Sequence, residues 1–400
     1  MPGPGVVVPG VVVIGAGQAA VQLAASLRQG GYAEPITLIG DEPGLPYQRP
    51  PLSKAYMTGE MNQSALLLRP ENFYEQQRID LLENTKATSI DRATKRVHLA
   101  NGALIEYTHL VLATGARNRQ LPNAEGAAYL RTKAEADHLR GRLDTAGEII
   151  VIGAGFIGLE FAAVAAARGA QVTIVEMAPV VMGRAVSKPM ADHVAALHRQ
   201  WGSHLLTNTG VNRITATTVE TTTGKTLTAD IVVAGIGVLP NTDLAEQAGL
   251  PIANGICVDA TLRTQDPAIS AIGDCASFPS AFGPIRLESV QNAADQARAV
   301  ADRLLGRPTP YGKVPWFWSD QGPLKLQIAG LITGHDRCIL RGTQDSGSFS
   351  VFCYRGETLL GIESINRPAE HMISRRLLVA PKLTHAQAAD DSFDLRTALT

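Results

Sequence analysis

The sequence predicts an α/β fold in which two three-layer strand–helix units precede a smaller α+β region. Two runs support this prediction, because VVVIGAGQAA at 11–20 and EIIVIGAGFIGLE at 148–160 each place an apolar strand before a glycine-rich turn and an apolar helix. A complete strand–turn–helix–strand unit that occurs twice favours two related domains. From Val314 onward, aromatic residues and short apolar runs instead indicate antiparallel strands.

The first glycine-rich turn contains Gly15, Gly17 and Ala20 in the pattern G-x-G-x-x-G/A. The first glycine permits a tight turn, the second lets the backbone approach a pyrophosphate, and the small third residue lets the helix pack on the strand. The N–H groups and the dipole at the start of the helix then attract phosphate. The turn therefore predicts a Rossmann-like dinucleotide site, although glycine turns of this kind also occur for packing reasons alone.

A helix over 19–29, closed by Gly30 and Gly31, leads to a second strand, ITLIGDE. An acidic residue at the end of this strand normally binds the adenosine ribose hydroxyls. Because Gly40 occupies the strand end, either Asp41 or Glu42 has this role, and we favour Asp41. The alternative is a solvated loop acid.

The segment 46–60, PYQRPPLSKAYMTGE, combines a rigid proline pair with a lysine. Pro50 and Pro51 restrict the backbone, and Ser53 is then expected to cap a helix that contains Lys54. Such a segment suits a cation held against a bound cofactor, where it stabilises developing negative charge. As a bare pattern it is also compatible with a proline-stiffened surface turn. Strands over 79–115 then lead into the apolar run LVLATGA.

The second glycine turn contains Gly153, Gly155 and Gly158, and Glu176 closes the strand that follows. A carboxylate here accepts hydrogen bonds from a free 2′-hydroxyl and repels a 2′-phosphate, which favours NADH over NADPH. Arg184 is the opposing signal, since a nearby arginine accommodates a 2′-phosphate, unless it only forms a surface salt bridge.

The composition of the chain argues against several classes of protein, namely nucleic-acid-binding, membrane and secreted proteins. The chain has 400 residues, 45% of them hydrophobic, and a formal net charge of −1, so no global basic field favours nucleic acid or an anionic membrane. The N-terminus lacks a charged region and a cleavage site, and no apolar run is long enough to span a membrane, so a cytoplasmic protein is expected. The four cysteines show no C-x-x-C spacing and are interpreted as small buried hydrophobes, which argues against a redox-active disulfide.

Taken together, the motifs resemble the ferredoxin reductases of oxygenase systems, the putidaredoxin reductase and biphenyl dioxygenase ferredoxin reductase type of the glutathione reductase superfamily. The resemblance covers nearly the whole chain in the same order. It rests on GAGQAA at 15–20, RPPLSK at 49–54, ATGA at 113–116, YLRT at 129–132, GAGFIGLE at 153–160, AIGDCA at 271–276, ESVQNA at 289–294 and PWFWSDQ at 315–321.

The resemblance implies two Rossmann-like dinucleotide-binding domains and a C-terminal α+β domain, with FAD and NADH as cofactors. The implied division is an FAD domain from 1–115 and 241–314, an NADH domain from 116–240, and a C-terminal domain from 315–400. The residues implied to bind FAD are Gly15, Gly17, Ala19, Ala20, Asp41, Arg49, Lys54, Ala87, Ala113, Thr114, Gly115, Arg131, Asp274, Val290 and Trp318. Those implied to bind NADH are Gly153, Gly155, Ile157, Gly158, Glu160, Glu176, Arg184 and Gly237.

Several roles follow from the resemblance in the same way. Lys54 and Glu160 are expected to position the nicotinamide and stabilise charge without transferring protons, although Glu160 is otherwise a helix N-terminal acid favoured by the dipole. Asp274 is expected at the ribityl chain, unless it is only a turn or cap aspartate, and the helix start near Val290 at the pyrimidine edge of the flavin. Of the two tryptophans, Trp316 and Trp318, the second is assigned a flavin or docking contact.

The implied activity is hydride transfer from NADH to FAD, followed by single-electron transfer to a 2Fe-2S ferredoxin that supplies a cytochrome P450 or a Rieske dioxygenase. A local basic patch for that ferredoxin is expected from Arg69, Arg307, Lys313, Lys325, Arg337 and Arg341. A monomer or weak dimer is expected. The alternatives are an NADH oxidase, a quinone or disulfide reductase, and a flavin-containing signalling protein similar to apoptosis-inducing factor. A disulfide reductase needs a cysteine within 41–60, where the chain has none.

Overall fold

The computed structural model describes residues 9–379 and 382–399. Residues 1–8 lie outside the described residues, and so does the part of the N-terminal strand prediction that falls on them. The chain divides into two compact units. The first comprises Met1–Gln48, Gln63–Arg117 and Leu239–Lys313, and the second comprises Arg49–Asn62, Asn118–Val238 and Val314–Thr400. The division into three domains by function stays a prediction.

The first unit is built on a seven-stranded mixed sheet in the order β3-β2-β1-β6-β5-β4, with β17 beside β6. The strands β3, β2, β1, β6 and β17 run parallel to their neighbours, whereas β4, β5 and β6 form an antiparallel meander. The strands are β1 (Gly10–Ile14), β2 (Ile36–Ile39), β3 (Ile79–Leu82), β4 (Ala87–Asp91), β5 (Arg96–Leu99), β6 (Leu104–Leu112) and β17 (Ile269–Ala271).

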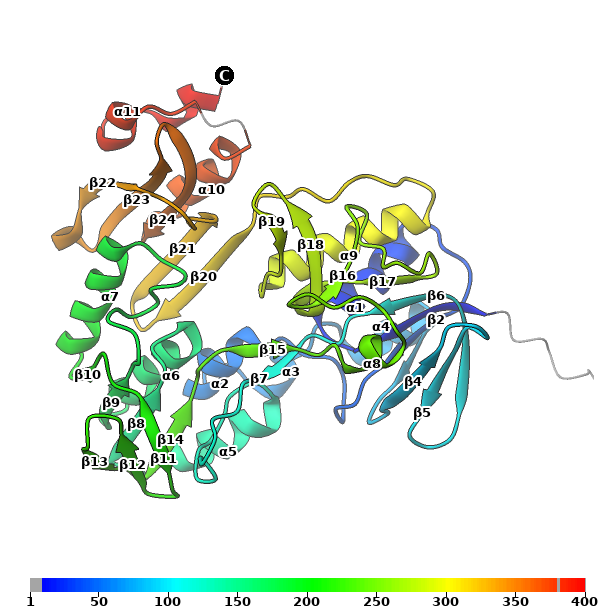
Figure 1. Cartoon of the computed structure of the whole chain (residues 1–400), viewed down its shortest axis with the longest axis horizontal. Coiled ribbons are helices and arrows are strands. Elements are labelled where there is room, and N and C mark those ends of the chain that lie inside the picture. Colours follow the sequence, from blue (N-terminus) through cyan, green and yellow to red (C-terminus); the bar gives the residue numbers. More distant parts are fainter. Residues whose placement is uncertain (1–8, 380–381, 400) are drawn as a thin grey trace, which may run out of the picture. The chain divides into compact units, whose positions relative to one another are not determined.

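Two long helices pack on each other in this unit although they are far apart in the sequence. They are α1 (Gln18–Gln29) and α9 (Val290–Leu304), which lie side by side in Figure 1. Their buried positions are mostly alanine, which lets the two helix backbones approach closely. The remaining elements of the unit are α3 (Gln63–Leu66), α4 (Glu71–Gln76), α8 (Asp243–Gln247), the 3₁₀ helix η2 (Gly273–Cys275), and a small sheet of β16 (Ile256–Cys257), β18 (Ala276–Ser280) and β19 (Gly283–Ile285).

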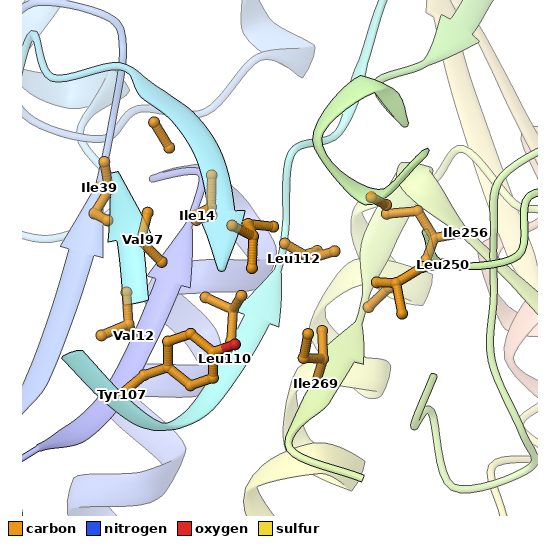
Figure 2. Packing of buried hydrophobic residues seen from close by; sticks show 14 of the residues in the cluster. Val12, Ile14, Ile39, Val97, Tyr107, Leu110, Leu112, Leu250, Ile256 and Ile269 are labelled. Carbon is orange, nitrogen blue, oxygen red and sulfur yellow. The ribbon is translucent and has the colours of Figure 1, made fainter. Parts of the chain in front are cut away.

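The core of the first unit lies where the parallel strands meet. Figure 2 shows Val12 and Ile14 of β1 beside Leu110 and Leu112 of β6, with Ile269 of β17 on the far side. These five side chains are all at most 5% exposed. Strands that are covered on both faces require continuous apolar runs, which explains the sequences VVVI and LVL. Because β1 is buried up to Ile14, the glycine-rich turn that connects it to α1 starts at the edge of the sheet.

The second unit repeats the plan with a parallel sheet in the order β10-β9-β8-β14. Its strands are β8 (Glu148–Ile152), β9 (Gln171–Val175), β10 (His204–Leu206) and β14 (Ile231–Ala234), and its helices are α5 (Lys133–Leu143), α6 (Phe156–Ala167) and α7 (Lys188–Gln200). A separate antiparallel sheet joins β11 (Val211–Ile214), β12 (Thr218–Thr221) and β13 (Thr226–Thr228). The connecting strands β7 (Ala116–Asn118) and β15 (Val238–Pro240) pair with each other.

The C-terminal part of the second unit is a five-stranded antiparallel sheet in the order β20-β21-β24-β23-β22. The strands are β20 (Trp316–Gln321), β21 (Leu324–Gly330), β22 (Arg337–Thr343), β23 (Ser348–Arg355) and β24 (Thr358–Ile365). They are accompanied by α10 (Pro368–Leu377), α11 (His385–Ala389) and the 3₁₀ helices η3 (Gln344–Ser346) and η4 (Leu395–Leu399). This sheet confirms the α+β region, and the mixed sheet of the first unit together with the parallel sheet of the second confirms the α/β class.

Candidate flavin and dinucleotide sites

The turn after β1 has the backbone that a pyrophosphate requires. Gly15 has φ +105°, and a Cβ there would lie 2.2 Å from the carbonyl oxygen of Ala113, so a side chain is excluded. At Gly17 the opposite holds, because a Cβ would meet no atom within 4 Å. Ala20, in the first turn of α1, is fully buried. Open space at the second glycine, in front of the first turn of α1, fits the approach of a phosphate group.

The second turn is a variant of the first, with a glycine at the third position. Gly153 has φ +96°, and a Cβ on Gly155 would meet only the carbonyl oxygen of Gly235, at 3.9 Å. A Cβ on Gly158 would lie 2.2 Å from the carbonyl oxygen of Gly153, so α6 packs too tightly on its own turn for even an alanine. Ile157, which is 36% exposed, projects from the first turn of α6. The cradle therefore fits a second dinucleotide.

Glu176 lies directly after β9 and is tied to the second turn. Its Oε2 accepts a hydrogen bond from the backbone N–H of Ala154 at 2.7 Å, and its Oε1 accepts one from Ala178 at 2.8 Å. These bonds orient the carboxylate at the mouth of the glycine turn, as a ribose ligand requires. The guanidinium of Arg184 lies near Gly237, since a Cβ there would be 3.8 Å from Nη2. The structure thus brings together two of the predicted NADH residues that are distant in sequence.

A buried ion pair joins the proline segment to α6. The Nζ of Lys54 lies 2.9 Å from Oε2 of Glu160, and the side chains are 17% and 4% exposed. The hydroxyl of Ser53 also donates to Oε2, at 2.6 Å, and that of Ser319 donates to Oε1, at 2.8 Å. Three donors on one carboxylate offset the cost of removing its charge from water. The ion pair joins the two residues to which the resemblance assigns the positioning of the nicotinamide, and that role stays a prediction.

The expected cap role of Ser53 is wrong. Ser53 is the last residue of the 3₁₀ helix η1 (Pro50–Ser53), and its hydroxyl is directed to Glu160. The helix α2 (Ala55–Thr58) starts after Lys54, and among the described residues no side chain caps it. The proline pair shapes a short 3₁₀ turn instead, and this turn presents Ser53 and Lys54 to the same carboxylate.

The hydrogen bonding continues from Glu160 along β20. The amide Nε2 of Gln321 donates to the hydroxyl of Ser319 at 3.1 Å, and its Oε1 accepts from Nε2 of His198 at 2.9 Å. The hydrogen bonds therefore run from His198 through Gln321 and Ser319 to Glu160, an order that requires the Nε2-protonated form of His198. Burial lowers the pKa of His198, which keeps the ring neutral.

Sequence reasoning missed Ser319, Gln321 and His198. The signal for the first two was present in WFWSDQ, because residues two apart on a strand share one face. Both side chains are fully buried, which is unusual for polar residues on an edge strand and indicates a specific partner. The position of His198 on α7, in contrast, has no local signal.

The other predicted flavin residues of the first unit cluster at the ends of β1, β6 and β17. Gly273, with φ +75°, lies between the two long helices, since a Cβ there would be 3.4 Å from the Cβ of Ala19 and 3.7 Å from that of Ala293. Asp274 follows it in η2, and Val290 begins α9. These elements therefore converge with the first glycine turn, in a cradle that fits FAD.

Two loops close the same end of the first unit. The hydroxyl of Thr114 donates to the carbonyl oxygen of Asn241 at 2.6 Å. In return, the side-chain amide of Asn241 donates to the carbonyl oxygen of Thr114 at 2.8 Å. Gly115 accepts from the N–H of Asn241 at 3.0 Å. Ala87 begins β4 and is almost buried in the core of the sheet. Its predicted contact with FAD stays a prediction.

Asp41 and Glu42 differ in their surroundings. Glu42 accepts a hydrogen bond from the hydroxyl of Tyr47 at 2.5 Å, and Asp41 is exposed. An exposed carboxylate remains accessible to ribose hydroxyls, which supports the preference for Asp41. Its role stays a prediction, as does the choice between the two acids.

The remaining predicted flavin residues belong to the second unit. Arg49 donates from Nη1 to the backbone oxygen of Arg131 at 2.8 Å, so the structure brings these two together. The ring centroids of Trp318 and Trp316 lie 5.5 Å apart. The guanidinium of Arg375 stacks on the ring of Trp316, 4.8 Å from its centroid. Trp316 therefore takes part in aromatic and cation–π packing. The functional contact of Trp318 is still an expectation.

Two expectations about surface and thiol chemistry need correction. Arg341 is only 4% exposed and pairs with Glu370 at 2.9 Å, so it is a buried structural residue and not part of a docking patch. Cys275 and Cys353 are buried, but Cys257 and Cys338 are partly exposed, so the four do not all behave as buried hydrophobes. Of the other proposed patch residues, Arg69, Arg307 and Lys313 belong to the first unit and Lys325 and Arg337 to the second.

The described residues hold neither a metal-binding cluster nor a membrane-spanning helix. Within residues 9–379 and 382–399, no group of three or more His, Cys, Asp or Glu side chains could hold a metal ion. Among the helices that the structure describes, none is long and apolar enough to cross a membrane.

Comparisons with known proteins agree with this geometry. Residues 9–297 match the family model of pyridine nucleotide-disulphide oxidoreductases, and residues 316–399 match that of the reductase C-terminal domain. Rhodocoxin reductase from Rhodococcus erythropolis is 49% identical over 97% of this chain and 94% of its own.

Two solved structures are similar along the whole chain. The ferredoxin reductase for the CYP199A2 system from Rhodopseudomonas palustris aligns with a TM-score of 0.96 and 48% identity, over 98% of this chain and 100% of that one. The covalent putidaredoxin reductase–putidaredoxin complex contains a chain that aligns with a TM-score of 0.95 and 39% identity, over 98% of both chains. The chain therefore belongs to the pyridine nucleotide-disulphide oxidoreductase family, among the FAD-dependent ferredoxin reductases of the putidaredoxin reductase type.

Proposed function

We propose that this chain is an NADH-dependent ferredoxin reductase whose acceptor is a 2Fe-2S ferredoxin that supplies an oxygenase. The observation that supports it best is the buried ion pair of Lys54 and Glu160, the two residues to which the resemblance assigns the positioning of the nicotinamide. The names of the similar proteins support the acceptor, because two of the three contain a ferredoxin or putidaredoxin. Segment 41–60 contains no cysteine, which disfavours a disulfide relay as the exit for electrons.

The two glycine turns would hold the cofactors. Gly15 and Gly17, with the start of α9, would bind FAD, and Gly153, Gly155 and Glu176 would bind NADH. Bound FAD supplies the conversion of a two-electron hydride donor into single electrons. The chain itself contributes binding, orientation and charge.

In this proposal Lys54 keeps a positive charge at a defined position. Glu160 fixes that ammonium, and Ser53 and Ser319 fix the Glu160 carboxylate in turn. A group held in this way costs no reorganisation at the moment of transfer, which is the basis of electrostatic preorganisation. Glu176 selects the nucleotide because it repels a 2′-phosphate.

An anaerobic stopped-flow experiment tests the proposal. The oxidised flavoprotein is mixed first with NADH or NADPH and then with a 2Fe-2S ferredoxin, a rubredoxin, a quinone or a disulfide in separate runs. We expect rapid bleaching of the flavin by NADH, slower bleaching by NADPH, and fast reoxidation by the ferredoxin. Reoxidation only by oxygen, a quinone or a disulfide would leave the family intact and overturn the assigned acceptor.

The oxygenase is tested in a second step. A ferredoxin that reoxidises the flavin is combined with a haem-thiolate cytochrome P450 or with a Rieske dioxygenase, and NADH-dependent product formation is measured. Product from either system supports the proposed place of the reductase. If the ferredoxin is reduced efficiently but no oxygenase forms product, the proposed supply of an oxygenase is contradicted, whereas the proposed reduction of a ferredoxin is not.

A further inference from the structure

Two cysteines that are distant in sequence face each other in the C-terminal sheet. Cys338 on β22 lies directly opposite Cys353 on β23 in the antiparallel register. Opposed residues of such strands have Cβ atoms about 4.5–5.5 Å apart, close to the 3.5–4.5 Å of a disulfide, so a small adjustment would connect the sulfurs. Both cysteines are unoxidised in the structure.

The two thiols differ in their exposure to solvent, and hence in their access to an oxidant. Cys338 lies on β22, the edge strand of the sheet, and is partly exposed, whereas Cys353 is fully buried. A small oxidant in solution therefore reaches Cys338 first. Cys353 is then held behind it, on the neighbouring strand, as the only thiol in register with it.

Polar groups surround the pair. Ser187, His335 and Glu363 lie close enough to the two thiols to affect their pKa values. The hydrogen bond from Cys353, with the help of His335, lowers the pKa of Cys338 to about 6, while the same bond and burial raise the pKa of Cys353. Cys338 therefore has thiolate character at neutral pH, which is the form that reacts with oxidants.

We propose that Cys338 and Cys353 form a redox-active thiol pair that hydrogen peroxide oxidises to an intrachain disulfide. This inference goes beyond the proposed function, and it involves neither ferredoxin nor nicotinamide. The pair is distinct from the sites above, because it lies between β22 and β23 and shares no residue with the Glu160 network.

The reaction balances in two steps. The Cys338 thiolate attacks one oxygen of hydrogen peroxide, the O–O bond breaks, and hydroxide leaves as water after protonation, which gives a sulfenic acid on Cys338. The sulfur of Cys353 then attacks the Cys338 sulfur, the S–S bond forms as the S–O bond of the sulfenic acid breaks, and the departing hydroxide leaves as water with the thiol proton of Cys353. Two thiols thus lose two electrons to one peroxide, and a dithiol reductant reverses the change.

Peptide mapping of the full-length holoenzyme tests this assignment. Cleavage after Arg337, Arg341 and Arg355 places the two cysteines in separate tryptic peptides, 338–341 and 342–355. The reduced protein is treated with stoichiometric hydrogen peroxide, denatured, alkylated and digested. We expect a species that joins both peptides, with a mass lower than their sum by two hydrogen atoms, and its loss after treatment with dithiothreitol.

The other two cysteines are controls within the same sample. Cys257 is partly exposed and pairs in register with Ser277, and Cys275 is buried, so both should stay alkylatable. Cys338→Ser should abolish the joined species, and Cys353→Ser should stop at a sulfenic acid on Cys338 that dimedone traps. Oxidation of Cys257 as fast as Cys338, or no joined species while the flavin spectrum of the wild type is intact, would overturn the proposal whether or not the variants fold.

Discussion

A buried carboxylate keeps its charge only while its partners stay in place. Glu160 has three such partners, the ammonium of Lys54 and the hydroxyls of Ser53 and Ser319. Replacing Glu160 by the isosteric glutamine keeps the volume of the side chain but leaves the ammonium of Lys54, whose side chain is 17% exposed, without its carboxylate. Glu160 can therefore be tested without creating a cavity.

We predict that Glu160→Gln folds and binds FAD but reduces the flavin more slowly with NADH, by about tenfold or more, because a loosened positioning group misaligns the reactants. The measurement is anaerobic stopped-flow bleaching, with FAD content as the check on folding. Asp192→Asn is the matched control, since Asp192 forms an exposed pair with Lys188 on α7, with side chains 55% and 74% exposed. An unchanged bleaching rate in Glu160→Gln would refute the positioning role.

Glu176 permits a prediction about nucleotide choice. Its carboxylate accepts from two backbone N–H groups and repels a 2′-phosphate, so Glu176→Gln should lower the preference for NADH over NADPH by about tenfold, or ~1.4 kcal/mol. The ratio of kcat/KM for the two nucleotides measures this. Arg184 near Gly237 should become the phosphate ligand, so adding Arg184→Ala should abolish the gained NADPH activity. A ratio that does not change would remove Glu176 from nucleotide selection.

At the scale of the element, the two glycines of the first turn do different work. Gly15 is required by the fold, because its φ of +105° and the nearby Ala113 oxygen exclude a side chain. Gly17 has open space around its α-carbon, and its φ of −88° suits any residue. The fold therefore does not require glycine at position 17, and the expected reason for it is the close approach of a bound pyrophosphate.

We predict that Gly17→Ala folds but binds FAD more weakly, whereas Gly15→Ala lowers the yield of folded protein. The FAD-to-protein absorbance ratio and the melting temperature of the apoprotein separate the two effects. Gly141→Ala on α5 is a matched control, since a Cβ there also meets no atom within 4 Å, and alanine in a helix is neutral or mildly stabilising. Full FAD occupancy in Gly17→Ala would contradict a pyrophosphate site at this turn.

At the scale of the whole molecule, local patterns predicted the type and order of the main elements, but not all of their ends. The two glycine turns, the acid after each second strand and the α+β region all depend on residues within one strand–helix unit, so they are visible in the sequence. The same holds for Lys54 and Glu160 as individual residues, each set by a local motif.

What the sequence could not show depends on register and packing between distant segments. Ser53 was expected to cap a helix but donates to Glu160, because α6 lies beside η1. Cys338 and Cys353 become neighbours only through the pairing of β22 with β23, and Arg341 is buried only because the C-terminal residues fold over it. Such non-local contacts leave no periodic signal in a single sequence.

The stability of the second unit should depend on pH through Glu363, a fully buried residue of β24 that accepts hydrogen bonds from the backbone and hydroxyl of Ser187, at 2.7 and 2.5 Å. Burial raises the pKa of Glu363 to about 7 from 4.5, against the opposing effect of Ser187. The folded state therefore binds this proton more tightly than the unfolded chain does. The resulting stabilisation is complete below about pH 4.5 and is lost as the pH rises through about 7.

We predict that the contribution of Glu363 to the free energy of unfolding falls by about 3 kcal/mol between about pH 4.5 and pH 7, the two pKa values of its carboxyl in the unfolded and folded states. Glu363→Gln has no proton to lose at this site, so its melting temperature should fall less between about pH 5 and pH 8. Glu357→Gln is the matched control, because Glu357 lies in the turn between β23 and β24 with its side chain 85% exposed, and its pH profile should follow the wild type. Differential scanning fluorimetry of the three proteins measures the slopes. Parallel profiles for the wild type and Glu363→Gln would show that Glu363 is ionised in the folded protein throughout this range.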